Sequence, residues 1–234
     1  MADFLAFFSI ENAWFTLWDY PVSYLEAIGT FFGVFSVYLA SRADIHTWST
    51  GIVNVILFFL IYYQVQLYAD MLLQIYFLVM SIYGWLVWHK RKTGVPGNIL
   101  SLGVKKQMYL YLAIAGGAIG LGLVIDNLHD FLPVWFSQPA AFPLADALTT
   151  VLSIFATILL ARKIMQSWIL WIMVDLISIV LYWQRGIYLI ALEYLLFLII
   201  ATAGFLQWRK IYDNEQRIGN REIYATAPGA SVPD

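Results

Sequence analysis

Residues 84–90 read GWLVWHK, and residues 204–210 read GFLQWRK. Both strings belong to a longer repeat, in which residues 26–90 recur without a gap 120 positions later. Of these 65 positions, 17 are identical. A shared apolar bias would match leucine with leucine, but it would not align Arg, Trp, Gln and Lys at a single offset. The chain is therefore predicted to contain one structural unit twice, because a fixed long period is typical of repeated architecture.

The composition is that of a membrane protein. Apolar residues make up 62% of the chain and charged residues 12%, whereas soluble domains carry about a quarter charged residues. The net charge of −2 gives no reason to expect nucleic acid as a partner. The chain has no cysteine, which excludes disulfides and thiolate metal sites. We predict neither a metal site nor a cofactor.

Seven apolar stretches have the length of a spanning helix, which needs about 20 residues to cross the bilayer. The predicted spans are 22–41, 47–64, 68–89, 107–125, 143–161, 167–184 and 187–208. Two further segments are predicted to lie on the membrane surface because they are rich in Phe and Trp. These are residues 1–21 and residues 127–142.

Basic residues predict the orientation of the chain in the membrane. Of the 13 Lys and Arg residues, 12 follow the first, third, fifth or seventh span, and only Arg185 lies on the other side. Loops rich in Lys and Arg stay in the cytoplasm. We therefore expect the N-terminus outside and the C-terminus in the cytoplasm. Residues 211–234 are polar and are predicted to be a disordered tail.

These observations together predict an all-α membrane protein with seven transmembrane helices. The repeat pairs the first three spans with the last three. These two triplets start on the same side of the membrane, because four crossings separate the first span from the fifth. They would form 3+1+3 parallel repeats, the SWEET-like plan of some sugar transporters. The fourth span is rich in Gly and Ala and is predicted to be a packing connector. The expected segments are 1–21, interfacial; 22–90, first repeat; 91–142, basic loop, fourth span and outer loop; 143–210, second repeat; and 211–234, tail.

Asp175 is the strongest candidate for a functional residue. It lies in the middle of the sixth span, where a carboxylate is costly and is a functional candidate by default. At 100° per residue, one face of this span carries Trp168, Trp171, Asp175, Ser178 and Tyr182. The alternative is a helix contact in which Asp175 is hydrogen-bonded to a neighbour.

Other candidates lie on the second, third and seventh spans. Asn54 is expected either to contact a substrate or to form an interhelical hydrogen bond. The third span carries Gln74, Phe77, Ser81, Trp85 and Trp88 on one face, and the seventh carries Tyr194, Phe197, Ala201, Phe205 and Trp208 on the equivalent face. Packing is the alternative for Gln74 and Tyr194. For Trp88, Trp208, Trp48 and Trp168 the alternative is an aromatic belt at the membrane interface.

This inventory suits a small, ring-bearing, neutral or cationic solute. Trp and Tyr faces attract cationic rings, and Asp, Asn and Gln bind hydroxyls and amides. A phosphate would meet no Arg or Lys at depth. No Lys lies within a span, which excludes a retinal Schiff base. No nucleophile faces a base, so the chain is predicted not to be an enzyme.

Four strings carry a resemblance to a known family. They are WSTGIVN at 48–54, LYADMLLQ at 67–74, YGWLVW at 83–88 and WILWIMVD at 168–175. Over about residues 22–210 the chain resembles the Pnu family of bacterial vitamin transporters, and most closely its nicotinamide riboside transporters. The resemblance implies a multi-pass protein of the bacterial inner membrane. It also implies uptake of nicotinamide riboside by facilitated diffusion, with phosphorylation by a cytoplasmic kinase trapping the substrate.

The expected partners are nicotinamide riboside, the lipid bilayer, a functionally coupled cytoplasmic riboside kinase and other copies of the chain. From the resemblance and the helical faces, the predicted substrate-binding residues are Asn54, Gln74, Trp85, Trp88, Trp168, Trp171, Asp175, Tyr182, Tyr194 and Trp208. Two alternatives stay open. One is a transporter with the same fold that carries another ring-bearing vitamin, such as thiamine or riboflavin, or a nucleoside or a sugar. The other is a membrane receptor or scaffold that does not transport.

Overall fold

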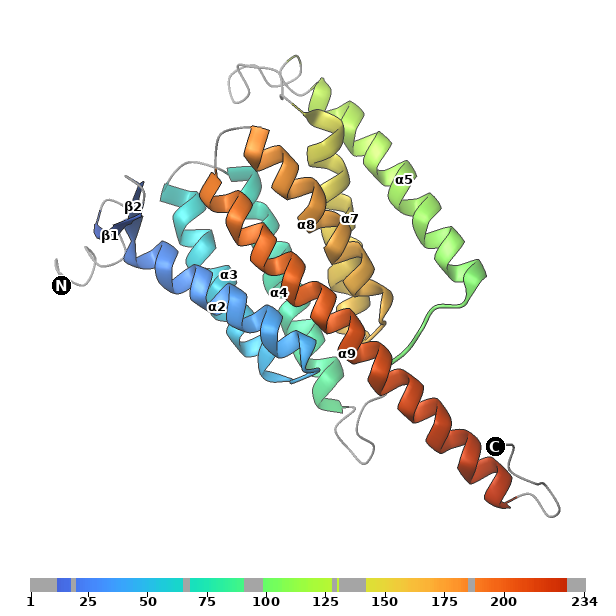
Figure 1. Ribbon diagram of the computed structural model, residues 1–234. Coiled ribbons are helices and arrows are strands. Elements are labelled where there is room, and N and C mark those ends of the chain that lie inside the picture. The colour runs from blue at the N-terminus through green and yellow to red at the C-terminus, as the bar shows by residue number, and fades with distance from the viewer. Residues whose placement is uncertain are drawn as a thin grey trace. The chain divides into compact units, whose positions relative to one another are not determined.

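The structure is a computed structural model that describes residues 12–17, 20–64, 68–90, 99–127, 130, 142–184 and 188–226 (Figure 1). Its long helices are α2 (Tyr24–Ser41), α3 (His46–Gln64), α4 (Tyr68–Lys90), α5 (Val104–Asp126), α7 (Pro143–Ala161), α8 (Gln166–Gln184) and α9 (Tyr188–Thr226). Among the described residues, each of these seven helices is long and apolar enough to cross a membrane. The number of predicted spans is confirmed, and their expected limits agree with the helices to within a few residues, except at the end of α9.

A short β-hairpin precedes the first long helix. Strands β1 (Ala13–Leu17) and β2 (Tyr20–Ser23) pair in antiparallel register. The hairpin departs from the all-α prediction. The surface-lying prediction for residues 1–21 rested on aromatic content, but aromatic and β-branched residues also favour strands. The other aromatic residues used in that prediction, at positions 4, 7, 8 and 18, lie outside the described part of the chain.

Helix α2 begins at a capping box that also holds the hairpin. Ser23 Oγ accepts a hydrogen bond from the Glu26 amide, and the Glu26 carboxylate accepts one from the Ser23 amide at 2.8 Å. Tyr20 Oη donates to Glu26 Oε1 at 2.7 Å. This hydrogen bond, with burial and the Glu26 charge, raises the pKa of Tyr20 to about 12. The phenol therefore stays protonated at neutral pH and keeps donating to Glu26.

The sequence repeat is also a repeat of local structure. The bounds of α3 and α8 differ by 120 residues at both ends, and α2 and α7 end 120 residues apart. Each of the latter pair is followed by a residue in the left-handed conformation, Ala43 with φ 54° and Lys163 with φ 56°. In both turns, the amide of this residue and the next amide donate to helix carbonyls in a Schellman pattern.

The chain divides into two compact units, residues 1–96 and 97–234, each described here by itself. In the first, α3 packs against both α2 and α4. In the second, α8 packs against α7 and α9, and α5 packs against α7 (Figure 1). The predicted packing role of α5 is confirmed at Gly117 and Gly122, where an added Cβ would lie 3.3 Å from Val151 and from Leu144 respectively.

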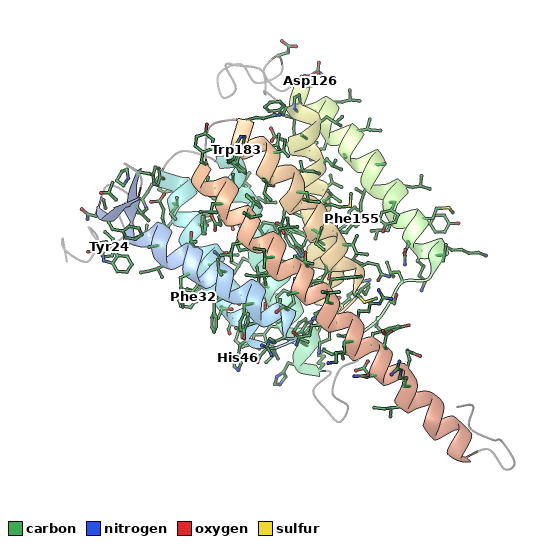
Figure 2. All side chains as sticks on the ribbon, in the orientation of Figure 1. Tyr24, Phe32, His46, Asp126, Phe155 and Trp183 are labelled. Atoms are coloured by element: carbon green, nitrogen blue, oxygen red, sulfur yellow. The ribbon has the colours of Figure 1, made fainter. Side chains whose placement is uncertain are left out.

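The equivalent helix pairs α2–α3 and α7–α8 are held together by different interactions. In the second unit an apolar cluster joins α5, α7 and α8, with Leu152, Ala156 and Leu170 fully buried. Phe155, labelled in Figure 2, packs against it. In the first unit α2 and α3 are joined by reciprocal hydrogen bonds: Ser36 Oγ donates to the Thr47 carbonyl at 2.7 Å, and Thr47 Oγ1 donates to the Ser36 carbonyl at 2.9 Å.

A short segment ties the start of α5 to the turn before α8. Leu100 forms a parallel bridge with Ile164. The buried Gln166 side chain accepts from the Leu102 amide at 3.0 Å and donates to Ser101 Oγ at 2.9 Å. This connection, together with the packing of α5 on α7, joins α5 to the second unit.

Helix α9 continues to Thr226, so the predicted disordered tail is wrong over residues 211–226 (Figure 1). A helix that is already formed extends without a new nucleation cost, and residues 209–226 contain several good helix formers. Arg209 and Asp213 lie one turn apart, with 4.0 Å between Nε and Oδ2. Residues 227–234, and most of the predicted surface loop at 127–142, lie outside the described residues.

Candidate functional site

Asp175 is buried on α8, with 3% of its surface exposed. Its neighbours Val174 and Ser178 on the same helix are buried too. Within the described residues, no hydrogen bond or ion pair joins the Asp175 carboxylate to another group. The alternative of a hydrogen-bonded structural contact therefore has no support in that part of the chain. A buried carboxylate without a partner is costly, which keeps Asp175 the leading candidate for contact with a ligand.

Trp171 lies one turn before Asp175 and is half-buried against the apolar cluster of the second unit. Its counterpart in the first unit is Gly51. An added Cβ on Gly51 would meet Ser36 Oγ at 3.2 Å and Ser81 Oγ at 3.7 Å. The two units therefore differ most in side-chain volume at this position, one presenting an indole ring and the other closely packed hydroxyls.

Tyr182 and Tyr194 form a stacked pair that joins α8 to α9. Their ring centroids are 5.5 Å apart, and the ring planes differ by 13°. Phe197 meets Tyr194 edge-on at 6.1 Å. The structure thus brings together two of the predicted site residues from different helices. Half-buried aromatic faces of this kind are suited to stacking with a flat ring.

The four repeated tryptophans form two matching internal pairs. Trp48 and Trp88 have centroids 5.4 Å apart at 89°, and Trp168 and Trp208 have centroids 5.6 Å apart at 85°. All four rings are buried. Burial inside the protein does not support the aromatic-belt alternative, since belt residues face lipid headgroups. Substrate contact by Trp88, Trp168 and Trp208 stays a prediction, and the role that their contacts show is packing.

In each tryptophan pair, one indole ring packs directly against a glycine of the next helix, a contact that the sequence did not predict. We call this contact a tryptophan seat. An added Cβ on Gly84 would lie 2.5 Å from the Trp48 ring, and one on Gly204 would lie 2.9 Å from the Trp168 ring. The signal was present, because both glycines recur at the repeat offset four residues before a repeated tryptophan. The seats fix the start of α3 against α4 and the start of α8 against α9.

Asn54 forms the interhelical hydrogen bond that was one of its two predicted roles. Asn54 Nδ2 on α3 donates to the Gly29 carbonyl on α2 at 2.8 Å. Gly33, one turn further along α2, would bring an added Cβ to 2.8 Å from the same nitrogen. The side chain is half-buried, so this bond does not remove it from contact with a ligand.

Gln74 and Trp85 on α4 complete the predicted set. Gln74 is half-buried and Trp85 is 43% exposed. They lie three helical turns apart on the face that also carries the buried Ser81. Within the described residues no cluster of His, Asp and Glu could hold a metal ion. Among all the candidate residues, the only charged group is the Asp175 carboxylate.

Comparison with known proteins decides the family. The model of the nicotinamide mononucleotide transporter family matches residues 23–210, most of the chain. The chain belongs to this family. The resemblance to the Pnu transporters is confirmed, and the family is one of membrane transporters rather than enzymes. With seven apolar helices, the chain is a multi-pass protein of the bacterial inner membrane.

Several curated relatives cover most of the chain. The nicotinamide riboside transporter PnuC of Escherichia coli (strain K12) is 34% identical, over 86% of this chain and 93% of its own length. The Neisseria mucosa PnuC is 24% identical, over 82% and 74%. The riboflavin/roseoflavin transporter RibM of Streptomyces davaonensis is 22% identical, over 83% and 88%. These proteins are what the chain is similar to: two are named for nicotinamide riboside and one for riboflavin.

One solved structure has the same fold. It is the crystal structure of the vitamin B3 transporter PnuC, with a TM-score of 0.63, 22% identity and coverage of 82% of this chain and 83% of that chain. At this identity the likeness concerns the fold alone.

Proposed function

We propose that the chain carries nicotinamide riboside across the inner membrane by facilitated diffusion. The observation that carries the proposal is the charge of the candidate residues: one buried carboxylate, Asp175, without a basic group beside it in the candidate set. Nicotinamide riboside has a cationic pyridinium ring. A carboxylate attracts that charge, and aromatic rings attract it through their faces.

Each part of this substrate has a counterpart among the proposed contacts. The pyridinium ring stacks on the Tyr182–Tyr194 pair or on Trp171 and lies near the Asp175 charge. Asn54 and Gln74 bind the carboxamide or the ribose hydroxyls. Support comes from relatives named as nicotinamide riboside transporters, one of them 34% identical to this chain.

The family name points to the mononucleotide, whereas the named relatives point to the riboside. The residues favour the riboside. A phosphate is bound in proteins by Arg, Lys or helix N-termini, and no Arg or Lys belongs to the proposed set. The same chemistry supports trapping: once a cytoplasmic kinase adds a phosphate, the product is a poor ligand for the carrier and stays inside.

The proposed architecture follows from the repeat and from the basic residues. The two triplets α2–α4 and α7–α9 would be parallel, SWEET-like repeats, with the hairpin outside and the end of α9 in the cytoplasm.

Calorimetry on the purified protein tests the substrate. We expect binding of nicotinamide riboside and at least tenfold weaker binding of the mononucleotide, since the phosphate meets a carboxylate and no base. Tighter binding of the mononucleotide would overturn the assignment. Riboflavin and thiamine belong in the same titration series because RibM is also a relative.

Uptake into proteoliposomes tests the mechanism. Labelled nicotinamide riboside should enter and equilibrate without ATP and without an imposed ion gradient. Accumulation above the outside concentration that depends on a gradient would show coupled transport instead. No uptake beyond that of empty liposomes would favour a receptor or scaffold.

A further inference from the structure

We propose that Gly33 is a positioning residue that holds Asn54 with its amide oxygen toward the substrate. Asn54 would then select substrates that carry a carboxamide over those that carry a carboxylate. The inference rests on the proposed function, since it concerns how the same site tells nicotinamide riboside from its acid analogue.

The orientation of the Asn54 amide follows from its partner. Its side chain donates to the Gly29 carbonyl at 2.8 Å. A backbone carbonyl oxygen only accepts hydrogen bonds, so the atom that faces it has to be the amide nitrogen. The side-chain oxygen, Oδ1, consequently points to the other side of the amide and is the atom available to a ligand.

Gly33 makes this arrangement sterically feasible. An added Cβ there would lie 2.8 Å from Asn54 Nδ2 and 3.5 Å from Cγ. The first distance is shorter than a carbon–nitrogen contact tolerates. The amide is held by its hydrogen bond to α2, so a methyl group at position 33 would displace the amide and weaken that bond.

The oxygen is free to act as an acceptor. Asn54 is half-buried, and Oδ1 makes no hydrogen bond to any other described residue. An unpaired amide oxygen that is partly withdrawn from water is a strong site for an N–H or O–H donor. It repels a carboxylate, which offers only acceptors at neutral pH.

The second unit shows that packing does not require this trio. The positions equivalent to Gly29, Gly33 and Asn54 are Thr149, Ser153 and Val174. There α7 and α8 are held together by an apolar cluster that includes Val174. Since α7 and α8 pack together without the three residues, their presence in one unit alone points to recognition of an asymmetric ligand.

The carboxamide of nicotinamide riboside fits this acceptor, because its NH2 group supplies two donors. Nicotinic acid riboside carries a carboxylate at the same ring position. That group has no donor, and the Asn54 amide oxygen repels its negative charge. We therefore expect Gly33 and Asn54 to control the ratio of the affinity for nicotinamide riboside to the affinity for nicotinic acid riboside.

Calorimetry on the full-length protein with both ribosides tests the proposal. Wild type should bind nicotinamide riboside at least tenfold more tightly than nicotinic acid riboside, the size expected for one lost hydrogen bond plus repulsion. Gly33→Ala should weaken binding of nicotinamide riboside about tenfold and reduce the ratio. Gly116→Ala is the matched control, because an added Cβ at Gly116 meets nothing within 4 Å.

Asn54→Val is a second variant, for use if Gly33→Ala does not fold. It introduces valine, the residue that the second unit has at the equivalent position, Val174. It removes the acceptor and keeps Gly33, and it should also reduce the ratio. An unchanged ratio in either folded variant would overturn the proposal while the proposed function stands. If wild type binds no nicotinamide riboside, both the proposed function and this refinement fail.

Discussion

Asp175 illustrates, at the scale of a single residue, why a charge in a membrane helix points to function. Its carboxylate is buried on α8, and no hydrogen bond to another described residue offsets the loss of water. Such a group costs stability, so a cationic ligand that pairs with it gains an interaction that the empty protein lacks.

Asp175→Asn keeps the shape of the side chain and removes the charge. Binding of nicotinamide riboside should weaken roughly tenfold or more, because a charge-assisted contact is replaced by a neutral one. The thermal stability in detergent should be unchanged or higher, since a neutral amide is easier to bury.

The reduced riboside, whose ring is uncharged, is the control ligand for Asp175→Asn. Its affinity, measured by calorimetry, should change much less than that of the cationic form. Equal losses for the two ligands would show that Asp175 acts as a hydrogen-bond acceptor or in packing rather than as the partner of the cation.

At the scale of the helices, the tryptophan seats are a feature that both units share. In each, an indole at the start of the second helix lies on a glycine of the third and meets a second indole edge-on. The seats join the second and third helix of each triplet at one end. They therefore fix the packing of the second helix against the third in each unit.

Gly204→Ala should destabilise the protein by about 1–3 kcal/mol, the usual cost of overpacking a core. An added Cβ there lies within 2.9 Å of the Trp168 ring, and the ring is enclosed. The measurement is the thermal midpoint of the detergent-solubilised protein. Gly84→Ala should behave in the same way.

Gly120→Ala is the matched control for the seat, because an added Cβ at Gly120 meets nothing within 4 Å. It should be neutral or slightly stabilising, since alanine is the better helix former. A second change, Trp168→Phe, should restore part of the stability of Gly204→Ala. A Gly204→Ala protein as stable as wild type would refute the role given to the seat.

At the scale of the whole molecule, the orientation in the membrane is the prediction that matters most for transport. The positive-inside rule places the hairpin outside and the end of α9 in the cytoplasm. The chain has no cysteine, so single cysteines can be introduced without removing any native ones.

Thr16 on β1 and Gln216 on α9 are exposed and are predicted to lie on opposite sides of the membrane. Each is replaced by cysteine in a separate variant, Thr16→Cys and Gln216→Cys. In intact spheroplasts a membrane-impermeant maleimide should label Thr16→Cys, and it should label Gln216→Cys only after the membrane is opened. The reverse pattern would invert the topology. Labelling of both in intact spheroplasts would contradict the odd number of crossings.

The helices were predictable, whereas much of the candidate site was not. Seven apolar runs of about 20 residues leave few alternatives in a bilayer, because an unpaired backbone cannot cross it. The β-hairpin was missed because its aromatic residues also suit the membrane surface. The helical end of α9 was missed because polar composition hides its continuity with an existing helix.

The site residues show the same division. The shared face of Trp171, Asp175 and Tyr182 follows from helical periodicity alone. Which partner each side chain meets depends on the register between helices. The belt position suggested for Trp168 and the open choice for Asn54 reflect that dependence.

By itself, the sequence determined the membrane class, the seven spans, the doubled unit and the family, because these depend on composition, period and motif. Only the tertiary structure decided that Asn54 Nδ2 binds Gly29, that the tryptophans are seated on Gly84 and Gly204, and that Tyr182 stacks on Tyr194. These are contacts between different helices. A contact of this kind depends on how far one helix is shifted and rotated against the next, and the packing of side chains between the helices sets that shift.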